Sequence, residues 1–155
     1  MEDKKIRIYT DGSCNTQLKV GGWAAIIFIG KDKEVLHGSE SNTTHNRMEL
    51  LAVIKSLEYV VEMFDKMVTI EVYTDSQYVH KIPERAEKLQ SNNFITKKGN
   101  VLNNKDLIKS LISLLNQSNI NLIKVKAHQK STGKSNYNRE VDMLSRQIVR
   151  DKSKK

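Results

Sequence analysis

Close to its N-terminus the chain reads Ile6-Arg7-Ile8-Tyr9-Thr10-Asp11-Gly12-Ser13, and the prediction of the fold starts from these residues. Their side chains alternate with a period of two, which is typical of a β-strand. Asp11-Gly12 is a pair that usually marks a turn, so we expect the strand to end at Asp11. A similar ending returns at the close of residues 68–75, where Asp75 again follows Tyr-Thr. Two such strands predict two carboxylates at one edge of a sheet, and we expect a metal site built around Asp11.

Length and composition indicate one globular domain. The chain has 155 residues, of which 38% are apolar and 28% charged, enough for a substantial core. We expect a single domain over 1–155, with its core at about 5–150 and a frayed basic tail at 151–155. No apolar run is long enough to cross a bilayer, and the start lacks the apolar segment of a signal peptide. The single cysteine, Cys14, cannot form an internal disulfide, which favours the cytoplasm.

The net charge favours a polyanionic partner. The chain carries 26 Lys and Arg against 18 Asp and Glu, a formal charge of +8, and the tail holds only a small part of it. A basic folded surface is typical of proteins that bind nucleic acid, although a merely soluble basic protein would look the same.

The remaining pattern predicts an α/β domain with a mixed sheet and helices on its faces. Further strands are expected at 21–30, 34–41, 68–75 and 120–126, the first two forming an antiparallel meander with the opening strand. Helices are expected from the capping segment 42–46 to Phe64, at 76–81, at 84–90, from Asn103 or Asn104 to Leu115, and at 138–150. Residues 91–100 and 128–137 are expected to form polar, basic loops.

Four acidic residues are candidate metal ligands: Asp11, Glu49, Asp75 and Asp142. Carboxylates brought close together repel one another, and a hard divalent cation such as Mg²⁺ or Mn²⁺ removes that conflict. Two such ions roughly 4 Å apart can hydrolyse a phosphodiester without a protein nucleophile. No serine elbow, zinc ligand set or phosphate-binding lysine loop is found. Taken singly, each carboxylate is better explained by a structural role, as a turn former, a helix cap or the partner of a nearby arginine.

Several blocks of sequence resemble the type I ribonuclease H family. The three longest are Tyr9-Thr10-Asp11-Gly12-Ser13-Cys14, Thr44-His45-Asn46-Arg47-Met48-Glu49-Leu50 and Tyr73-Thr74-Asp75-Ser76-Gln77-Tyr78-Val79. The family's final blocks are matched by Val125-Lys126-Ala127-His128 and Asn138-Arg139-Glu140-Val141-Asp142. The blocks follow the family's order and cover nearly the whole chain.

The resemblance implies a fold and an activity. The fold would be ribonuclease H-like, with a five-stranded mixed sheet of three antiparallel and two parallel strands. The activity would be hydrolysis of the RNA strand of RNA–DNA hybrids by a monomer with two Mg²⁺ ions, leaving 5′-phosphate and 3′-hydroxyl ends. Mn²⁺ would substitute. The carboxylates Asp11, Glu49, Asp75 and Asp142 would bind the metal, Glu49 would also sense the ribose 2′-hydroxyl, and His128 would assist proton transfer or product departure.

The resemblance also implies contacts to the hybrid. Bases or riboses would be touched by Cys14, Asn46 and Gln77, and a DNA phosphate by Thr44. Asn138 would support the site or cap the last helix. Gln17 falls near an RNA-contacting asparagine of the family and His45 replaces a common one, so both are expected substrate contacts. Lys97 and Lys98 are expected to bind the substrate in the region that corresponds to the family's basic handle, which here contains no tryptophan.

Three other functions remain open on the residues alone. The chain could be a non-catalytic module that binds hybrids or double-stranded RNA, although such a module has no need of clustered carboxylates. It could be a resolvase or transposase, although it lacks room for a DNA-targeting domain. An interaction module that uses its basic surface is the third.

Overall fold

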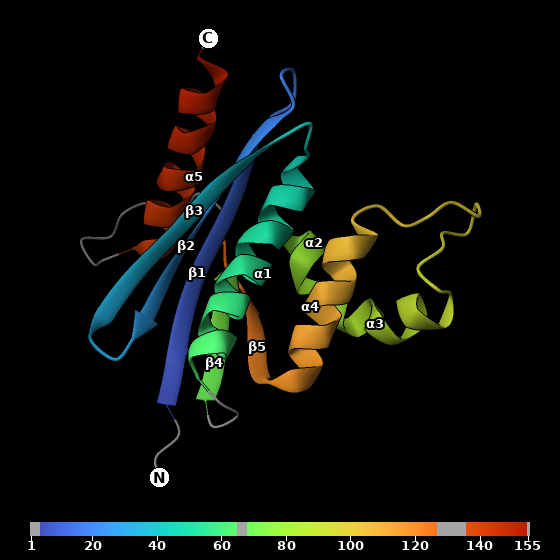
Figure 1. The fold of residues 1–155 in the computed structure, drawn as a ribbon, viewed down its shortest axis with the longest axis horizontal. Coiled ribbons are helices and arrows are strands. Elements are labelled where there is room, and N and C mark those ends of the chain that lie inside the picture. The colour runs from blue at the N-terminus through green and yellow to red at the C-terminus, as the bar shows by residue number, and fades with distance from the viewer. Residues whose placement is uncertain (1–3, 65–67, 127–135, 155) are drawn as a thin grey trace.

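The computed structural model describes residues 4–64, 68–126 and 136–154 as an α/β fold (Figure 1). The strands are β1 (Lys4–Asn15), β2 (Val20–Ile29), β3 (Asp32–Ser41), β4 (Val68–Thr74) and β5 (Asn119–Lys124). The helices are α1 (His45–Met63), α2 (Gln77–His80), α3 (Ile82–Ser91), α4 (Lys105–Gln117) and α5 (Tyr137–Ser153).

The five strands form one mixed sheet in the order β3-β2-β1-β4-β5. β1 pairs antiparallel with β2, and β2 with β3, whereas β4 runs parallel to both β1 and β5. The expected sheet of three antiparallel and two parallel strands is confirmed. β1 lies at its centre, where it joins the antiparallel half to the parallel half.

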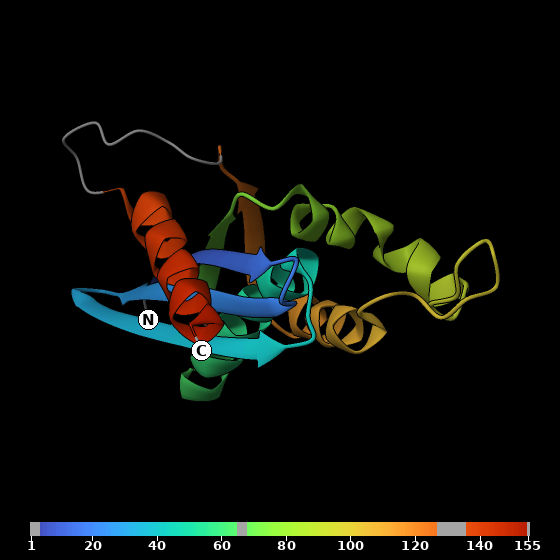
Figure 2. The same cartoon turned by 90° about the horizontal axis from the view of Figure 1, so that it is seen from above.

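Helices cover both faces of the sheet, which explains the unbroken apolar run of β2. Ala25 and Ile27 face the main core together with Leu50 and Leu57 of α1, whereas Ala24 and Ile26 pack with Val141 of α5. Successive side chains of a strand point to opposite faces, so a strand covered on both sides is apolar throughout. Figure 2 shows the sheet from above, with α5 alongside the strands.

Helix α3 and the chain that follows it extend away from the sheet (Figure 1). α4 packs against α1 through a buried face that includes Leu111, and the chain between α3 and α4 returns through an isolated bridge between Ile95 and Val101. This segment carries Lys97 and Lys98. We call α3 and residues 92–104 the handle.

The first strand does not end at Asp11, and this prediction was wrong. β1 continues in register with β2 from Asp11 opposite Ala24 to Asn15 opposite Val20, and the turn follows Asn15. Gly12 does not form a turn but allows a close backbone contact, because a Cβ there would lie 2.3 Å from the backbone nitrogen of Glu49. The lack of a side chain lets the first turns of α1 approach β1.

The end of the chain also differs from the prediction. α5 continues to Ser153 instead of ending at Arg150, and β5 ends at Lys124 instead of 126. The cap of α5 is Asn136, whose side chain accepts a hydrogen bond from the backbone N–H of Arg139, so Asn138 is not the cap. Most of the expected 128–137 loop lies outside the described residues.

Candidate functional site

Three of the four candidate carboxylates converge at one end of the sheet. One oxygen each from Asp11, Glu49 and Asp75 lies within 4.8 Å of the others. Asp11 belongs to β1 and Asp75 directly follows its parallel neighbour β4, so the topology brings both to the same region. Glu49 comes from the first turns of α1, which Gly12 allows to pack closely on β1.

Burial makes the charge of this cluster unstable without a cation. Asp11 is 4% exposed and Glu49 is 3% exposed. Burial, followed by the nearby charges of Glu49 and Asp75, raises the pKa of Asp11 to about 9. Burial also raises the pKa of Glu49, against the opposing effect of a hydrogen bond with His45. Asp11 and Glu49 therefore each resist ionisation in this cluster.

The donor set fits a hard divalent cation. Oε2 of Glu49 is buried and has no hydrogen-bond partner within 4–64, 68–126 and 136–154, although a buried carboxylate oxygen normally has one. The three groups offer only carboxylate oxygens, the ligands that Mg²⁺ and Mn²⁺ prefer. A divalent ion would compensate the charge and occupy the unpaired oxygen.

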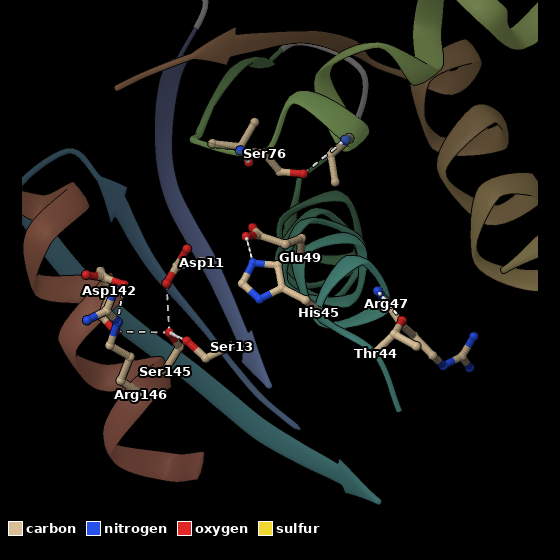
Figure 3. Close-up of polar contacts among 12 residues, drawn as sticks. Asp11, Ser13, Thr44, His45, Arg47, Glu49, Ser76, Asp142, Ser145 and Arg146 are labelled. Carbon is tan, nitrogen blue, oxygen red and sulfur yellow. Dashed lines mark hydrogen bonds and ion pairs between the residues drawn. The ribbon is translucent and has the colours of Figure 1, made fainter. Parts of the chain in front are cut away.

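Asp142 lies at the edge of the same site. It lines a cavity of about 380 Å³ together with Asp11, Glu49 and Asp75. Its Oδ1 lies 3.1 Å from Nε of Arg146, one turn later in α5, and Asp142 is not part of the three-carboxylate cluster (Figure 3). Asp142 therefore has the nearby arginine partner that the sequence offered as its structural role.

His45 contacts the carboxylate cluster directly. Its Nε2 lies 2.9 Å from Oε1 of Glu49, which follows four residues later in α1, and the imidazole is 58% exposed (Figure 3). The hydrogen bond with Glu49 raises the pKa of His45. The sequence pointed to a substrate contact here, and the i, i+4 spacing on a helix was the signal that could have predicted this pair.

The expected substrate contacts fall into adjoining cavities. Asn46 and Gln77 line the carboxylate cavity with His45. A larger cavity of about 880 Å³ is lined by Thr44, Asn46, Lys97 and Lys98. Thr44 is also the N-cap of α1, because its hydroxyl accepts a hydrogen bond from the Arg47 N–H.

The remaining expected residues are more dispersed. Asn138 lines a third cavity, of about 270 Å³, with Asp75 and Asp142. The Cys14 thiol donates to the Thr43 carbonyl oxygen at 3.6 Å. Gln17 is exposed in the turn after β1 and lines none of these three cavities. His128 lies outside the described residues.

Two further polar residues were missed by the sequence interpretation. The Ser145 hydroxyl donates to Oδ2 of Asp11 at 2.8 Å. Arg47 contacts Oε1 of Glu40 through Nε at 2.8 Å and Oδ2 of Asp106 through a terminal nitrogen at 3.1 Å, which ties α1 to β3 and α4. The contacts of Ser145 with Asp11 and of Arg47 with Asp106 join distant parts of the chain, and no local pattern signals them.

No helix in the described part of the chain is both long enough and apolar enough to cross a membrane.

Comparison with solved structures identifies similar folds. The crystal structure of LC9-RNase H1, a type 1 RNase H with the type 2 active-site motif, superposes with a TM-score of 0.81 at 19% identity, covering 97% of this chain and 74% of that one. The solution structure of the PFV RNase H domain gives a TM-score of 0.69 at 23% identity, covering 97% and 95%. At these identities the likeness concerns the fold alone.

Comparison of sequences identifies the family. A family model described as RNase H matches residues 3–150. Ribonuclease H of Wolbachia sp. subsp. Drosophila simulans is 38% identical over 152 residues, covering 97% of this chain and 99% of the relative. Ribonuclease H of Francisella tularensis subsp. novicida is 39% identical over 150 residues, covering 94% and 93%. The resemblance carried by the sequence blocks is thereby confirmed, and this chain belongs to the ribonuclease H family.

Proposed function

We propose that this protein is a metal-dependent endonuclease that hydrolyses the RNA strand of RNA–DNA hybrids, leaving 5′-phosphate and 3′-hydroxyl ends. The observation that carries the proposal is the convergence of buried Asp11, buried Glu49 and half-buried Asp75 in one cluster, in a chain that belongs to this family. A protein that only bound nucleic acid would gain nothing from buried carboxylates next to phosphates.

The proposed metal ligands are Asp11, Glu49, Asp75 and Asp142, and the proposed ions are two Mg²⁺, with Mn²⁺ as a substitute. When bound, such ions supply a water of lowered pKa and stabilise the charge on the leaving oxygen. Glu49 is proposed also to accept a hydrogen bond from the ribose 2′-hydroxyl, which DNA lacks. His128 is proposed to assist proton transfer or product departure.

The hybrid is proposed to lie across the carboxylate cavity and the larger cavity beside the handle. Asn46 lines both cavities, which supports a continuous track for the substrate. Lys97 and Lys98 are proposed to contact phosphates and Thr44 to hold a DNA phosphate. Contacts near the cut site are assigned, as proposals, to Cys14, Gln17, His45, Gln77 and Asn138.

We propose a monomer that acts in the cytoplasm. One cysteine in the sequence, half-buried in the structure, suits a reducing compartment. Size-exclusion chromatography with light scattering tests the oligomeric state.

One assay tests the function. A labelled hybrid, an RNA duplex, a DNA duplex and single strands are each incubated with Mg²⁺, Mn²⁺ or EDTA. We expect cleavage of the RNA strand of the hybrid alone, with loss of activity in EDTA and in Asp11→Asn. Tight binding of the hybrid without cleavage in either metal would overturn the proposal in favour of a binding module.

A further inference from the structure

We propose that Ser145 is a positioning residue whose hydroxyl holds the Asp11 carboxylate in the orientation needed to bind a divalent cation. This inference rests on the proposed metal-binding role of Asp11. Figure 3 shows Ser145 projecting from α5 toward Asp11, with Ser13 of β1 on its other side.

The geometry sets the direction of the hydrogen bonds. Oγ of Ser145 lies 2.8 Å from Oδ2 of Asp11 and 2.9 Å from Oγ of Ser13. An ionised carboxylate, the form that binds a cation, only accepts hydrogen bonds, so in that form Ser145 donates its single proton to Asp11 and accepts one from Ser13. The result is a chain of donors that runs from Ser13 through Ser145 to Asp11.

The hydrogen bond between Ser145 and Asp11 is buried. Ser145 is 0% exposed, so within the described residues its hydroxyl depends on protein partners. The carbonyl oxygen of Asp142 is a second possible acceptor, at 3.0 Å. The charged carboxylate of Asp11 is the stronger acceptor, because hydrogen bonds to ionised groups are shorter and stronger than those to neutral carbonyls.

The helix that carries Ser145 is held against the sheet at the same point. A Cβ added to Gly22 of β2 would lie 2.9 Å from the Ser145 carbonyl oxygen and 2.8 Å from Cγ2 of Ile148. α5 therefore lies directly on β2 there, and its backbone has little freedom to shift. Asp142 precedes Ser145 by three residues on this helix. The Ser145 hydroxyl therefore lies close both to the Asp11 carboxylate and to the backbone of Asp142.

A carboxylate fixed at one oxygen keeps its other oxygen in a defined direction. Hydrogen-bond partners behind metal ligands act in this way, and their loss typically costs 10-fold to 100-fold in metal affinity or activity, as a general range. Ser145 and Ser13 have this relation to Asp11, whereas a hydroxyl that only satisfied its own helix would not.

The chain offers a matched control in Ser56. Ser56 is also 0% exposed in a helix, but its hydroxyl donates only to the carbonyl oxygens of Ala52 and Val53 in α1. Ser56→Ala and Ser145→Ala each remove one buried hydroxyl from a helix, and only the second removes a contact to a carboxylate.

The test compares Ser145→Ala, Ser13→Ala and Ser56→Ala with the unmodified protein. Mg²⁺ binding is measured without substrate by titration calorimetry and by the rise in thermal midpoint on adding Mg²⁺. The Mg²⁺ concentration for half-maximal cleavage and the KM for the hybrid are then measured. For Ser145→Ala we expect Mg²⁺ affinity to fall about 10-fold, the Mg²⁺ requirement to rise equally and KM to stay unchanged. Ser13→Ala should show a smaller change in the same direction.

Wild-type Mg²⁺ affinity in Ser145→Ala would overturn the inference, and so would an equal loss of affinity in Ser56→Ala. Because binding is measured without nucleic acid, the proposed function can fail separately. A protein that cleaves no hybrid, but whose Mg²⁺ affinity falls in Ser145→Ala alone, would refute the function and support the role of Ser145.

Discussion

At the scale of single residues, the feature that governs the site is the carboxyl group of Asp11. It is buried among other acids, and its pKa is raised to about 9 from an ordinary value of 3.8. An acid with a raised pKa in the folded state stabilises the protein fully below its unfolded pKa, and this contribution is lost as pH rises through the folded pKa. Metal-free protein should therefore lose stability between about pH 4 and pH 9.

The first prediction concerns Asp11→Asn. The neutral amide carries no charge at any pH, so it should stabilise metal-free protein at pH 8 by about 2 kcal/mol, or roughly 4–8 °C in thermal midpoint. It should also remove the rise in midpoint on adding Mg²⁺. Thermal melts from pH 4 to pH 9, with and without Mg²⁺, check this. A variant less stable than wild type at pH 8 without metal would contradict it.

The second prediction concerns the pair of His45 and Glu49. Glu49 raises the pKa of His45, so the pair stabilises the protein below the ordinary histidine pKa of 6.5 and loses this effect as pH rises through the folded value. Protonated His45 competes with a cation for Glu49. His45→Asn should therefore lower the Mg²⁺ requirement for cleavage at pH 6 by about 3-fold, an order-of-magnitude expectation for a pair whose imidazole is exposed to solvent, and should change the requirement little at pH 8.

Mg²⁺ titrations of both proteins at the two pH values measure the effect of His45→Asn. Equal Mg²⁺ requirements at pH 6 would show that the imidazole does not compete. His37→Asn, on the edge strand β3 and away from the carboxylate cavity, controls for the loss of a histidine.

At the scale of secondary-structure elements, the site depends on the contact between β1 and α1. Gly12 brings the two backbones together, because the position of its missing Cβ lies 2.3 Å from Glu49 N and 2.4 Å from Met48 C. Backbone atoms cannot move aside as a flexible side chain can. The short distance between Asp11 and Glu49 thus depends on Gly12, which has a hydrogen atom where alanine has a methyl group.

The third prediction is that Gly12→Ala separates these elements. It should cost about 3 kcal/mol in the free energy of unfolding and lower Mg²⁺ affinity, because Asp11 and Glu49 move apart. Urea unfolding and calorimetry measure the two effects. Gly30→Asn is the control, since Gly30 has open space around its Cβ position and asparagine tolerates its positive φ of 60°. Equal destabilisation in both variants would contradict the role of Gly12.

Elements were the level at which the sequence was most informative. The period-two pattern of β1 and β4 and the helical spacing in α1 predicted those elements, because each reflects the faces that the core covers. The prediction of a turn at Asp11-Gly12 was wrong because the glycine is needed for the close contact with Glu49 of α1, 37 residues later in the chain. Ser145 was missed for the same reason, since its partner Asp11 is 134 residues distant. Local patterns report local geometry, and these two contacts are long-range.

At the scale of the whole molecule, the charge distribution governs binding. The chain carries a formal charge of +8, and Lys97 and Lys98 line the large cavity at the handle. The handle extends from the body on the opposite side from the C-terminal end of α5 (Figure 1). Binding to a polyanion through such a surface releases counterions and depends strongly on salt.

The fourth prediction follows from this distribution. Affinity for a hybrid, measured in EDTA to prevent cleavage, should fall at least about 10-fold between 50 and 200 mM salt. The double variant Lys97→Ala/Lys98→Ala should reduce the slope of log affinity against log salt by about 2. Lys152→Ala/Lys154→Ala, at the end of α5, removes the same charge and should leave the slope unchanged. An equal reduction in both double variants would show that the handle has no special role.

The last helix, α5, has a consequence for biosynthesis. The carboxylate cavity takes part of its wall from Asp142 and Arg146, and Asp11 is held from the same helix. Because α5 follows all five strands in the chain, the ribosome makes this helix after the sheet, and the cavity stays incomplete until α5 has packed on the sheet. We therefore expect a nascent polypeptide to carry an unfinished carboxylate cavity until synthesis has passed α5.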